Sequence, residues 1–264
     1  MILTPLAGPS RLRTTMAIPK ASPTQTGNPE LQVSLLKPEE AQQYMRVRHE
    51  VFRDTVNKIL YSRGEPSAAT LARVTEEIRD GVVNKGILYL KCVDVKTGEI
   101  VAGARWRCVK PKDPNVAERT WEEVDQDMAK GDPYEESDPA LFHALHDLFN
   151  ENKREILATR SHFVLDTLVT LPQHERRGAG SMLVRWGTER ADEAGFEAYL
   201  EASPMGAPMY ARHGFEPQKK VELDLRKYGG DEVLEFIVSD TPIRMHRLWN
   251  SADLFVANEE TCQC

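Results

Sequence analysis

The sequence predicts a single α/β (α+β) domain with a mixed, mostly antiparallel central sheet flanked by helices. Two apolar runs, residues 87–93 and 100–109, are joined by a short polar link and predict a β-hairpin. A strand-like run at 163–170 precedes a glycine-rich turn, a helical pattern and a second strand-like run at 196–203. A hairpin followed by alternating strands and helices is typical of a mixed sheet in one domain.

The first elements of the chain are a short strand and two helices. Residues 31–36 (LQVSLL) alternate apolar and polar side chains, as a half-buried strand does. Pro38 is suited to the first position of a helix, and apolar residues then recur at helical spacing as far as Phe52. A second helix is expected over about 67–80, with Ser67 or Thr70 as its N-terminal cap.

A polar segment, about residues 111–160, separates the hairpin from the strand at 163–170. Its first part is rich in turn residues and contains one short acidic helix around Trp121, whereas residues 141–157 form an amphipathic helical pattern. We interpret 111–160 as a helical insertion. After it, a helix runs from the glycine turn to Gly195, a short helix covers 207–212, and two final strands are expected at about 220–225 and 234–239.

Composition excludes several classes of protein. The 264 residues carry a net charge of −7, which disfavours a nucleic-acid backbone as the main partner. No apolar run approaches the roughly 20 residues that a membrane helix requires, so no membrane association is expected. Cys92 and Cys108 fall in predicted strands, and no cysteine spacing is typical of a metal site, so we expect no bound metal and a reducing compartment.

The two ends of the chain differ from its middle. Residues 1–29 contain Arg11, Arg13 and Lys20, no acidic residue, and many Ser, Thr and Pro. Such a segment is either an inert disordered extension or an organelle transit peptide. We therefore divide the chain into an extension (1–30), a domain (31–250) and a tail (251–264), and expect a cytoplasmic location, with a mitochondrial one as the alternative.

The glycine-rich turn is typical of a phosphate-binding loop. Backbone N–H groups converge where a helix begins, and the helix dipole favours negative charge there. Arg176 and Arg177 precede Gly178-Ala179-Gly180 and add two donors for a pyrophosphate. A P-loop is excluded because no lysine follows Gly180, and a dinucleotide fingerprint because Leu183 stands where the third glycine belongs.

The run LDTLVTLPQHERRGAGSMLV resembles motif A of the GCN5-related N-acetyltransferase (GNAT) superfamily. Leu168, Thr170 and Pro172 match the strand positions, and the two glycines match the loop; Glu175 stands where the family usually has Gln or Arg, and Thr170 where it usually has Val. A second block, with Ser203, Tyr210 and Gly214-Phe215, resembles the family's later motif at the right spacing. The specific resemblance covers about residues 163–220.

This resemblance implies a site for acetyl-CoA. The strand that carries Leu168 would splay from its neighbour, and the pantetheine arm would lie in the gap, where a backbone N–H polarises the carbonyl. Tyr210 would be the general acid for the leaving sulfur. The residues implied in cofactor binding lie on this strand, the loop and the second block: Leu168, Val169, Thr170, Arg176, Arg177, Gly178, Ala179, Gly180, Ser181 and Ser203.

The general base and the acceptor are less constrained. Glu201 and Asp166 are the candidate bases, with Glu201 ranked first; no Cys or Ser is placed for a covalent intermediate, so direct transfer is expected. The structural alternatives are Tyr210 as a packing aromatic, Glu201 as a solvent-facing strand residue and Asp166 as a structural carboxylate, which is favoured over Asp166 as base. Arg176 and Arg177 could likewise be solvated loop charges.

The predicted activity is transfer of an acetyl group from acetyl-CoA to an amine of a small molecule. Residues 44–70 and 226–245 are the segments expected to contact this acceptor. The alternatives are a catalytically silent acyl-CoA-binding protein, a protein or peptide N-acetyltransferase, and a different nucleotide-binding α/β protein. Homo-oligomerisation is not inferable from the sequence.

Overall fold

The computed structural model describes residues 27–243, which form one seven-stranded sheet with the strand order β1-β2-β3-β4-β5-β7-β6. All neighbouring strands are antiparallel except β4 and β5, which are parallel. This arrangement confirms the predicted mixed, mostly antiparallel sheet. The strands are β1 (Leu31–Leu35), β2 (Leu88–Asp94), β3 (Ile100–Val109), β4 (His162–Thr170), β5 (Glu197–Ala202), β6 (Glu216–Asp224) and β7 (Val233–Asp240).

The helices confirm most of the predicted pattern. Ser67, and not Thr70, caps the helix that follows it, because its side chain accepts a hydrogen bond from the Thr70 amide at 3.2 Å. The helices are α1 (Ala41–Phe52), α2 (Asn57–Leu60), α3 (Ala68–Val83), α4 (Trp121–Asp127), α5 (Pro139–Leu157), α6 (Ala179–Ala194) and α7 (Ala207–Ala211), with 3₁₀ turns η1 (Pro38–Glu40), η2 (Pro172–His174) and η3 (Leu225–Tyr228). The sequence did not predict α2, because four residues are too few to show helical periodicity.

One predicted boundary was wrong. Strand β6 begins at Glu216, four residues before the expected start at 220. Its first residues are polar and include Pro217, which a sheet tolerates at an edge strand or a bulge. Strand β6 is at the edge, and its pairing with β7 shifts register between Pro217 and Lys219. These first polar residues of β6 form a strand because β7 supplies their backbone hydrogen-bond partners. Their sequence shows no alternation of apolar and polar side chains that would have predicted it.

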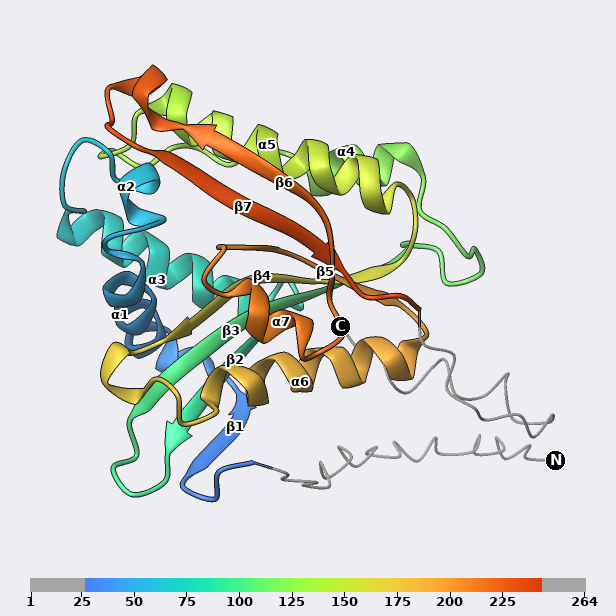
Figure 1. The fold of residues 1–264 in the computed structure, drawn as a ribbon, viewed down its shortest axis with the longest axis horizontal. Coiled ribbons are helices and arrows are strands. Elements are labelled where there is room, and N and C mark those ends of the chain that lie inside the picture. The colour runs from blue at the N-terminus through green and yellow to red at the C-terminus, as the bar shows by residue number, and fades with distance from the viewer. Residues whose placement is uncertain (1–26, 244–264) are drawn as a thin grey trace, which may run out of the picture.

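Helices cover both faces of the sheet (Figure 1). Helix α6 packs on one face, where its Leu183 and Val184 join Trp106, Leu200 and further apolar residues of the strands in the largest core cluster. On the other face, α1 and α3 pack through Tyr44 and Val74, and α5 packs through Leu157 against Val164 and Tyr199. The α6 face and the α1/α3/α5 face are therefore separately sealed by apolar side chains.

The contact between α6 and the sheet leaves no room at Gly187. A Cβ built on Gly187 would lie 2.1 Å from the ring of Trp106, a fully buried side chain. We expect Gly187→Ala to lower the free energy of unfolding by about 1–3 kcal/mol, since overpacking displaces the ring. Urea denaturation measures this, with Gly131→Ala, where a Cβ meets nothing within 4 Å, as the control. Equal stability of the two variants would contradict this packing.

Strands β4 and β5 are paired only at their beginnings. Their parallel pairing runs from His162 opposite Glu197 to Leu165 opposite Leu200 and then stops, although β4 continues to Thr170. The other edge of β4 stays paired with β3 to its end, with Ala102 opposite Thr170. The sheet therefore opens between β4 and β5 after four residue pairs, as the resemblance implied.

Some predictions fall on residues outside 27–243. The expected N-terminal extension lies there apart from its last residues, and so does the expected C-terminal tail. Within the described part of the chain, no helix is long and apolar enough to cross a membrane. No group of three or more His, Cys, Asp or Glu side chains gathers there as a set of metal ligands either.

Candidate active site

The glycine-rich turn leads from β4 into α6 and presents backbone N–H groups that donate to none of the described residues. Gly178 is the N-terminal cap of α6 and has a φ of +96°, a left-handed conformation that favours glycine. The first hydrogen bond of the helix is from the Met182 amide to the Gly178 carbonyl at 3.0 Å. The amides of Ala179, Gly180 and Ser181 therefore have no acceptor inside the helix, as at any α-helix N-terminus. This cradle fits a phosphate.

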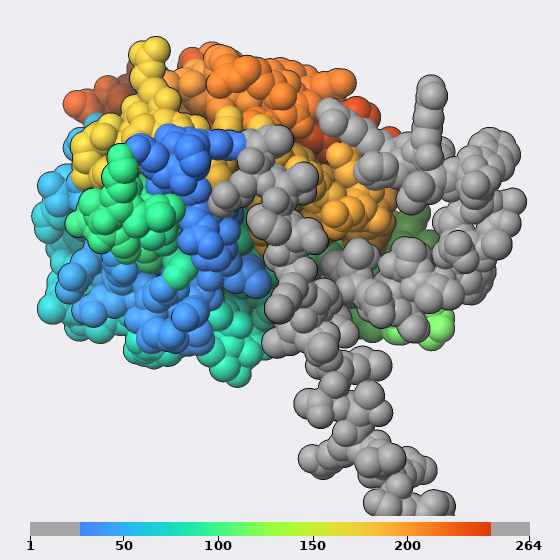
Figure 2. Space-filling model, turned by 90° about the horizontal axis from the view of Figure 1, so that it is seen from below, coloured from blue at the N-terminus to red at the C-terminus, as the bar shows by residue number. Residues whose placement is uncertain are grey.

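The two arginines of the turn are oriented differently. Arg176 is exposed and has a φ of +61°. Arg177 is tied to the body of the protein: its guanidinium lies 2.7 Å from the Asp94 carboxylate, 2.8 Å from His174 Nδ1 and 3.4 Å from Glu30. In Figure 2 the yellow surface near residue 175 lies against the blue and green surfaces of the chain near residues 30 and 95. The Arg177 side chain thus holds the loop in place, and its contribution to a ligand would come from its backbone N–H.

The end of β4 lies against the loop. Gly180 sits over Leu168 and Thr170, because a Cβ at Gly180 would lie 3.8 Å from a side-chain atom of each. Between them, Val169 points to the opposite face and is buried near α1. Since β5 has already left this part of β4, the backbone groups on that edge pair with no strand among residues 27–243. An extended, amide-containing ligand arm can pair with them.

Ser203 and Tyr210 belong to the turn and short helix that follow β5. The Ser203 carbonyl accepts hydrogen bonds from the amides of Gly206 and Ala207 at 3.0 and 3.1 Å, and so begins α7. The ring of Tyr210 packs edge-on against Phe215, with centroids 5.9 Å apart, on the α6 face of the sheet. Burial raises the pKa of Tyr210 above its ordinary range, so the hydroxyl is protonated at neutral pH, as a general acid must be.

Glu201 is a buried carboxylate on β5. Its side chain is 5% exposed, and its Oε1 makes no hydrogen bond to any described residue. Lys153 of α5 is the nearest cation, with its Nζ 3.8 Å from Oε1. Burial raises the pKa of Glu201, and Lys153 offsets only part of that rise. The side chain is therefore not a solvent-facing strand residue, and a carboxyl group with a raised pKa suits proton transfer.

Asp166, the second candidate base, is held in a buried ion pair. Arg107 donates two hydrogen bonds to it, at 2.7 and 3.1 Å, and Arg105 lies 3.6 Å away. Burial alone would raise the pKa of Asp166, but the two guanidinium groups outweigh burial and hold it far below its usual range. Such a carboxylate is a poor proton acceptor, and its contacts indicate a structural role.

Removal of the Asp166 charge is expected to destabilise the fold. Asp166→Asn leaves Arg107 buried without its main partner, which costs about 3–5 kcal/mol of unfolding free energy. Urea denaturation measures the loss, with Asp147→Asn, which removes an exposed partner of Lys130, as a control that loses less than about 1 kcal/mol. If Asp166→Asn keeps the wild-type denaturation midpoint but loses turnover, Asp166 acts in catalysis and not in stability.

Tyr210 and Glu201 lie on opposite faces of the sheet. Tyr210 belongs to the α6 face, whereas Glu201 contacts Lys153 on α5, which covers the other face (Figure 1). A thioester in the opening would have a proton donor on one side and a proton acceptor on the other.

A hollow of about 400 Å³ lies in the first segment expected to contact the acceptor. Its lining includes His49 at the end of α1, Asn57 and Tyr61 around α2, and Glu65. Asn57 donates a hydrogen bond to His49 Nδ1 at 3.1 Å, and His49 Nε2 lies 3.7 Å from the Glu65 carboxylate. Burial lowers the pKa of His49, which favours a neutral ring at pH 7.

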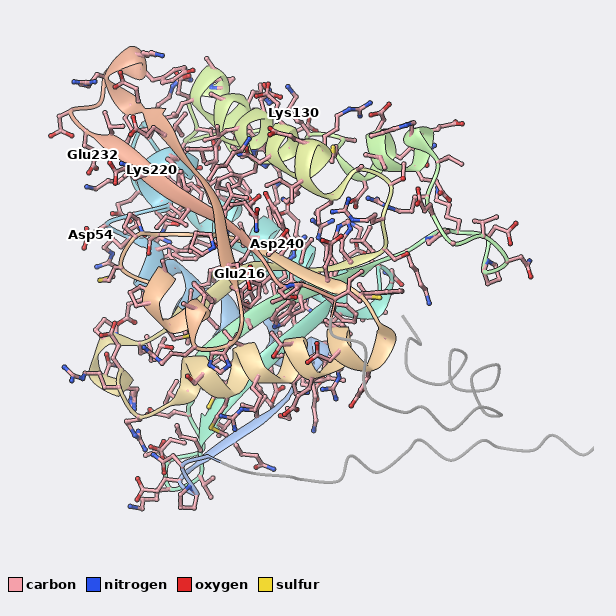
Figure 3. The ribbon with its side chains drawn as sticks, turned by 45° about the vertical axis from the view of Figure 1, so that its right-hand side comes forward. Asp54, Lys130, Glu216, Lys220, Glu232 and Asp240 are labelled. Carbon is pink, nitrogen blue, oxygen red and sulfur yellow. The ribbon has the colours of Figure 1, made fainter. Side chains whose placement is uncertain are left out.

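The two segments expected to contact the acceptor meet at Lys58. Its ammonium lies 2.8 Å from Glu232, in the segment before β7, and Asp54 adds a second negative charge nearby. Figure 3 shows Glu232 and Asp54 on the same side of the molecule. This ion pair therefore joins the segments 44–70 and 226–245, and Lys58 itself lines the hollow.

Sequence reasoning missed Lys153 and the arginines around Asp166. Lys153 lies on α5, in the predicted insertion, and nothing in its local pattern indicates contact with a strand almost fifty residues away. Arg105 and Arg107 alternate with apolar residues in β3, which was a usable signal of two cations on one strand face.

The chain matches the family described as "Acetyltransferase (GNAT) family" over residues 96–215. Solved structures with a similar fold include a mosquito arylalkylamine N-acetyltransferase like 5b, with 11% identity, a TM-score of 0.56, and coverage of 80% of this chain and 99% of that chain. Arylalkylamine N-acetyltransferase 2 from Aedes aegypti has 13% identity, a TM-score of 0.54, and coverage of 81% and 99%. The Drosophila melanogaster polyamine N-acetyltransferase that forms N-acetylagmatine has 14% identity, a TM-score of 0.52, and coverage of 80% and 98%. At these identities the structures show a shared fold.

Proposed function

Because residues 96–215 match the GNAT acetyltransferase family, we propose that this chain is an N-acetyltransferase that moves an acetyl group from acetyl-CoA directly to the amine of a small molecule. The observation that carries the proposal is the opening between β4 and β5, which lies beside the unpaired amides of the glycine turn. One ligand with a diphosphate and an extended amide arm matches both features. Glu201 and Tyr210 flank the place where its thioester would lie.

The proposed reaction needs one proton acceptor and one proton donor. The amine nitrogen attacks the thioester carbonyl, so that a C–N bond forms and the C–S bond breaks. Glu201 accepts the proton that the amine loses, directly or through a water molecule, and Tyr210 gives its proton to the departing sulfur. Backbone N–H groups at the end of β4 stabilise the charge on the carbonyl oxygen.

The substrate assignment rests on the hollow beside α2. Its volume of about 400 Å³ suits a small organic molecule. Its lining carries two cations, Arg53 and Lys58, of which Lys58 is paired with Glu232, while Tyr61 and Glu65 offer an aromatic ring and a carboxylate to an amine. Three structural relatives are named for arylalkylamines or polyamines, which supports testing these two classes of amine first. A protein or peptide N-terminus remains the second candidate acceptor.

Thermal melting tests the cofactor. Acetyl-CoA or CoA at a hundred times its dissociation constant should add about 2.7 kcal/mol to the stability and raise the melting midpoint by about 5–10 °C. ATP and NAD at the same concentrations should leave the midpoint unchanged. A shift with ATP or NAD but none with CoA would indicate a different nucleotide-binding α/β protein and would overturn the proposal.

Turnover is measured next, as CoA thiol release with a panel of arylalkylamines, polyamines and peptides. Release with at least one small amine, and none above background with peptides, is the expected result. CoA binding without release for any acceptor would instead favour the silent acyl-CoA-binding protein.

A further inference from the structure

His213 links the glycine turn to the α7 segment. Its Nε2 lies 3.0 Å from the Ser181 hydroxyl oxygen, and its backbone amide donates to the Tyr210 carbonyl at 2.8 Å. Ser181 is the third residue of α6, and its own amide is among those left open at the helix start. One half-buried histidine thus touches the predicted phosphate cradle with its side chain and the predicted general acid with its backbone.

The direction of the hydrogen bond between His213 and Ser181 matters for an anion. A serine hydroxyl has one hydrogen to donate. If Ser181 donates it to His213, only oxygen lone pairs remain for a phosphate. If His213 Nε2–H donates to Ser181, the hydroxyl hydrogen is available for the phosphate.

We propose that His213 is a positioning residue that donates to Ser181 and so turns the Ser181 hydroxyl toward the diphosphate of the bound coenzyme. This inference rests on the proposed function and adds a residue that the motif comparison did not include. The charges near His213 suit an anion at this corner, because Arg185 of α6 and Arg212 of its own turn are both positive. Neither arginine can accept a hydrogen bond from the His213 ring, so Ser181 is the acceptor that these neighbours leave for Nε2–H.

The role also implies a pH dependence. Burial, followed by Arg185 and Arg212, lowers the pKa of His213, so the ring is neutral at pH 7 and its tautomer is variable. Protonation puts a hydrogen on both ring nitrogens and fixes His213 as the donor. Affinity for the diphosphate should therefore rise as the pH falls through the pKa of His213, because the protonated ring always orients Ser181 correctly.

A double-mutant cycle tests the proposal through calorimetric binding of 3′-dephospho-CoA, which keeps the diphosphate but lacks the titrating 3′-phosphate. Ser181→Ala and His213→Ala should each weaken binding by about 3–10-fold, and the double variant should bind no more weakly than Ser181→Ala. His213→Gln, whose amide also donates, should restore most of the affinity. In turnover with acetyl-CoA, the single variants should raise KM and leave kcat within about twofold.

The pH arm separates positioning from packing. The wild-type protein should bind 3′-dephospho-CoA more tightly at pH 6 than at pH 8. The bound anion should raise the pKa of His213, and each pKa unit of that rise can strengthen binding by up to about tenfold. His213→Gln should show no such dependence, whereas His174→Gln, which alters the other histidine near the loop, should keep it. Additive losses in the cycle, or a Gln variant as weak as the Ala variant, would overturn the proposal. Wild type that fails to bind any CoA would overturn the proposed function as well.

Discussion

Tyr210→Phe is expected to lower kcat by about 10²–10⁴-fold while the KM for acetyl-CoA changes little, since the variant keeps the ring but loses the proton for the leaving sulfur. The ring packs edge-on against Phe215, so its shape is needed for packing and is preserved. Steady-state kinetics with the best amine of the panel measures the change. Burial holds the pKa of Tyr210 above its ordinary value, so the wild-type rate should not fall through loss of this proton up to pH 9.

The matched control is Tyr89→Phe. Tyr89 is a buried tyrosine of β2 that packs against Tyr44, away from the opening between β4 and β5. The Tyr89→Phe variant should retain the wild-type kcat. If Tyr210→Phe and Tyr89→Phe have the same kcat as the wild type, Tyr210 is a packing aromatic, and the leaving thiolate takes its proton from water.

Glu201→Gln is expected to lower kcat/KM by about 10²–10⁴-fold and to remove the acidic limb of the pH profile. Glu201 must be deprotonated to accept a proton, and burial raises its pKa, so the wild-type rate should climb with pH through that raised pKa. The variant should show a low rate that no longer depends on this titration. Kinetics across pH 5 to 9 with one amine measures both effects.

Stability separates this result from damage to the fold. A carboxyl group whose pKa is raised on folding opposes folding once it is ionised, so its cost is present above the folded pKa and is relieved below it. Glu201→Gln should therefore melt at or above the wild-type temperature at pH 8. An inactive variant with a much lower midpoint would instead show that the Lys153 contact is structural, and retained activity would show that Glu201 is not the general base.

The sequence predicted the parts of the site that depend on local geometry. A strand that ends before Pro172, followed by Gly178 and Gly180, specifies a turn and a helix start from local sequence alone. The spacing from Ser203 to Tyr210 likewise covers one turn and a short helix. These elements lie where the pattern predicted them, because their conformations are set within a dozen residues.

Contacts between distant segments were not predictable in the same way. Alternation along β5 does not tell which face Glu201 occupies, and only the packing of α5 brings Lys153 to it. Arg177 was expected to face a pyrophosphate, but the Asp94 and Glu30 carboxylates that hold it come from segments more than 80 residues earlier. Charge partners of this kind depend on the tertiary arrangement, which a single sequence does not encode locally.

The short pairing between β4 and β5 also bears on how cooperatively the fold melts. Four residue pairs join a four-stranded half of the sheet to a three-stranded half, so the two halves share few backbone hydrogen bonds. A ligand arm that bonds to both edges would act as an extra strand across this seam. Its binding free energy would then hold the two halves together, so that the unfolding of one half becomes coupled to the unfolding of the other.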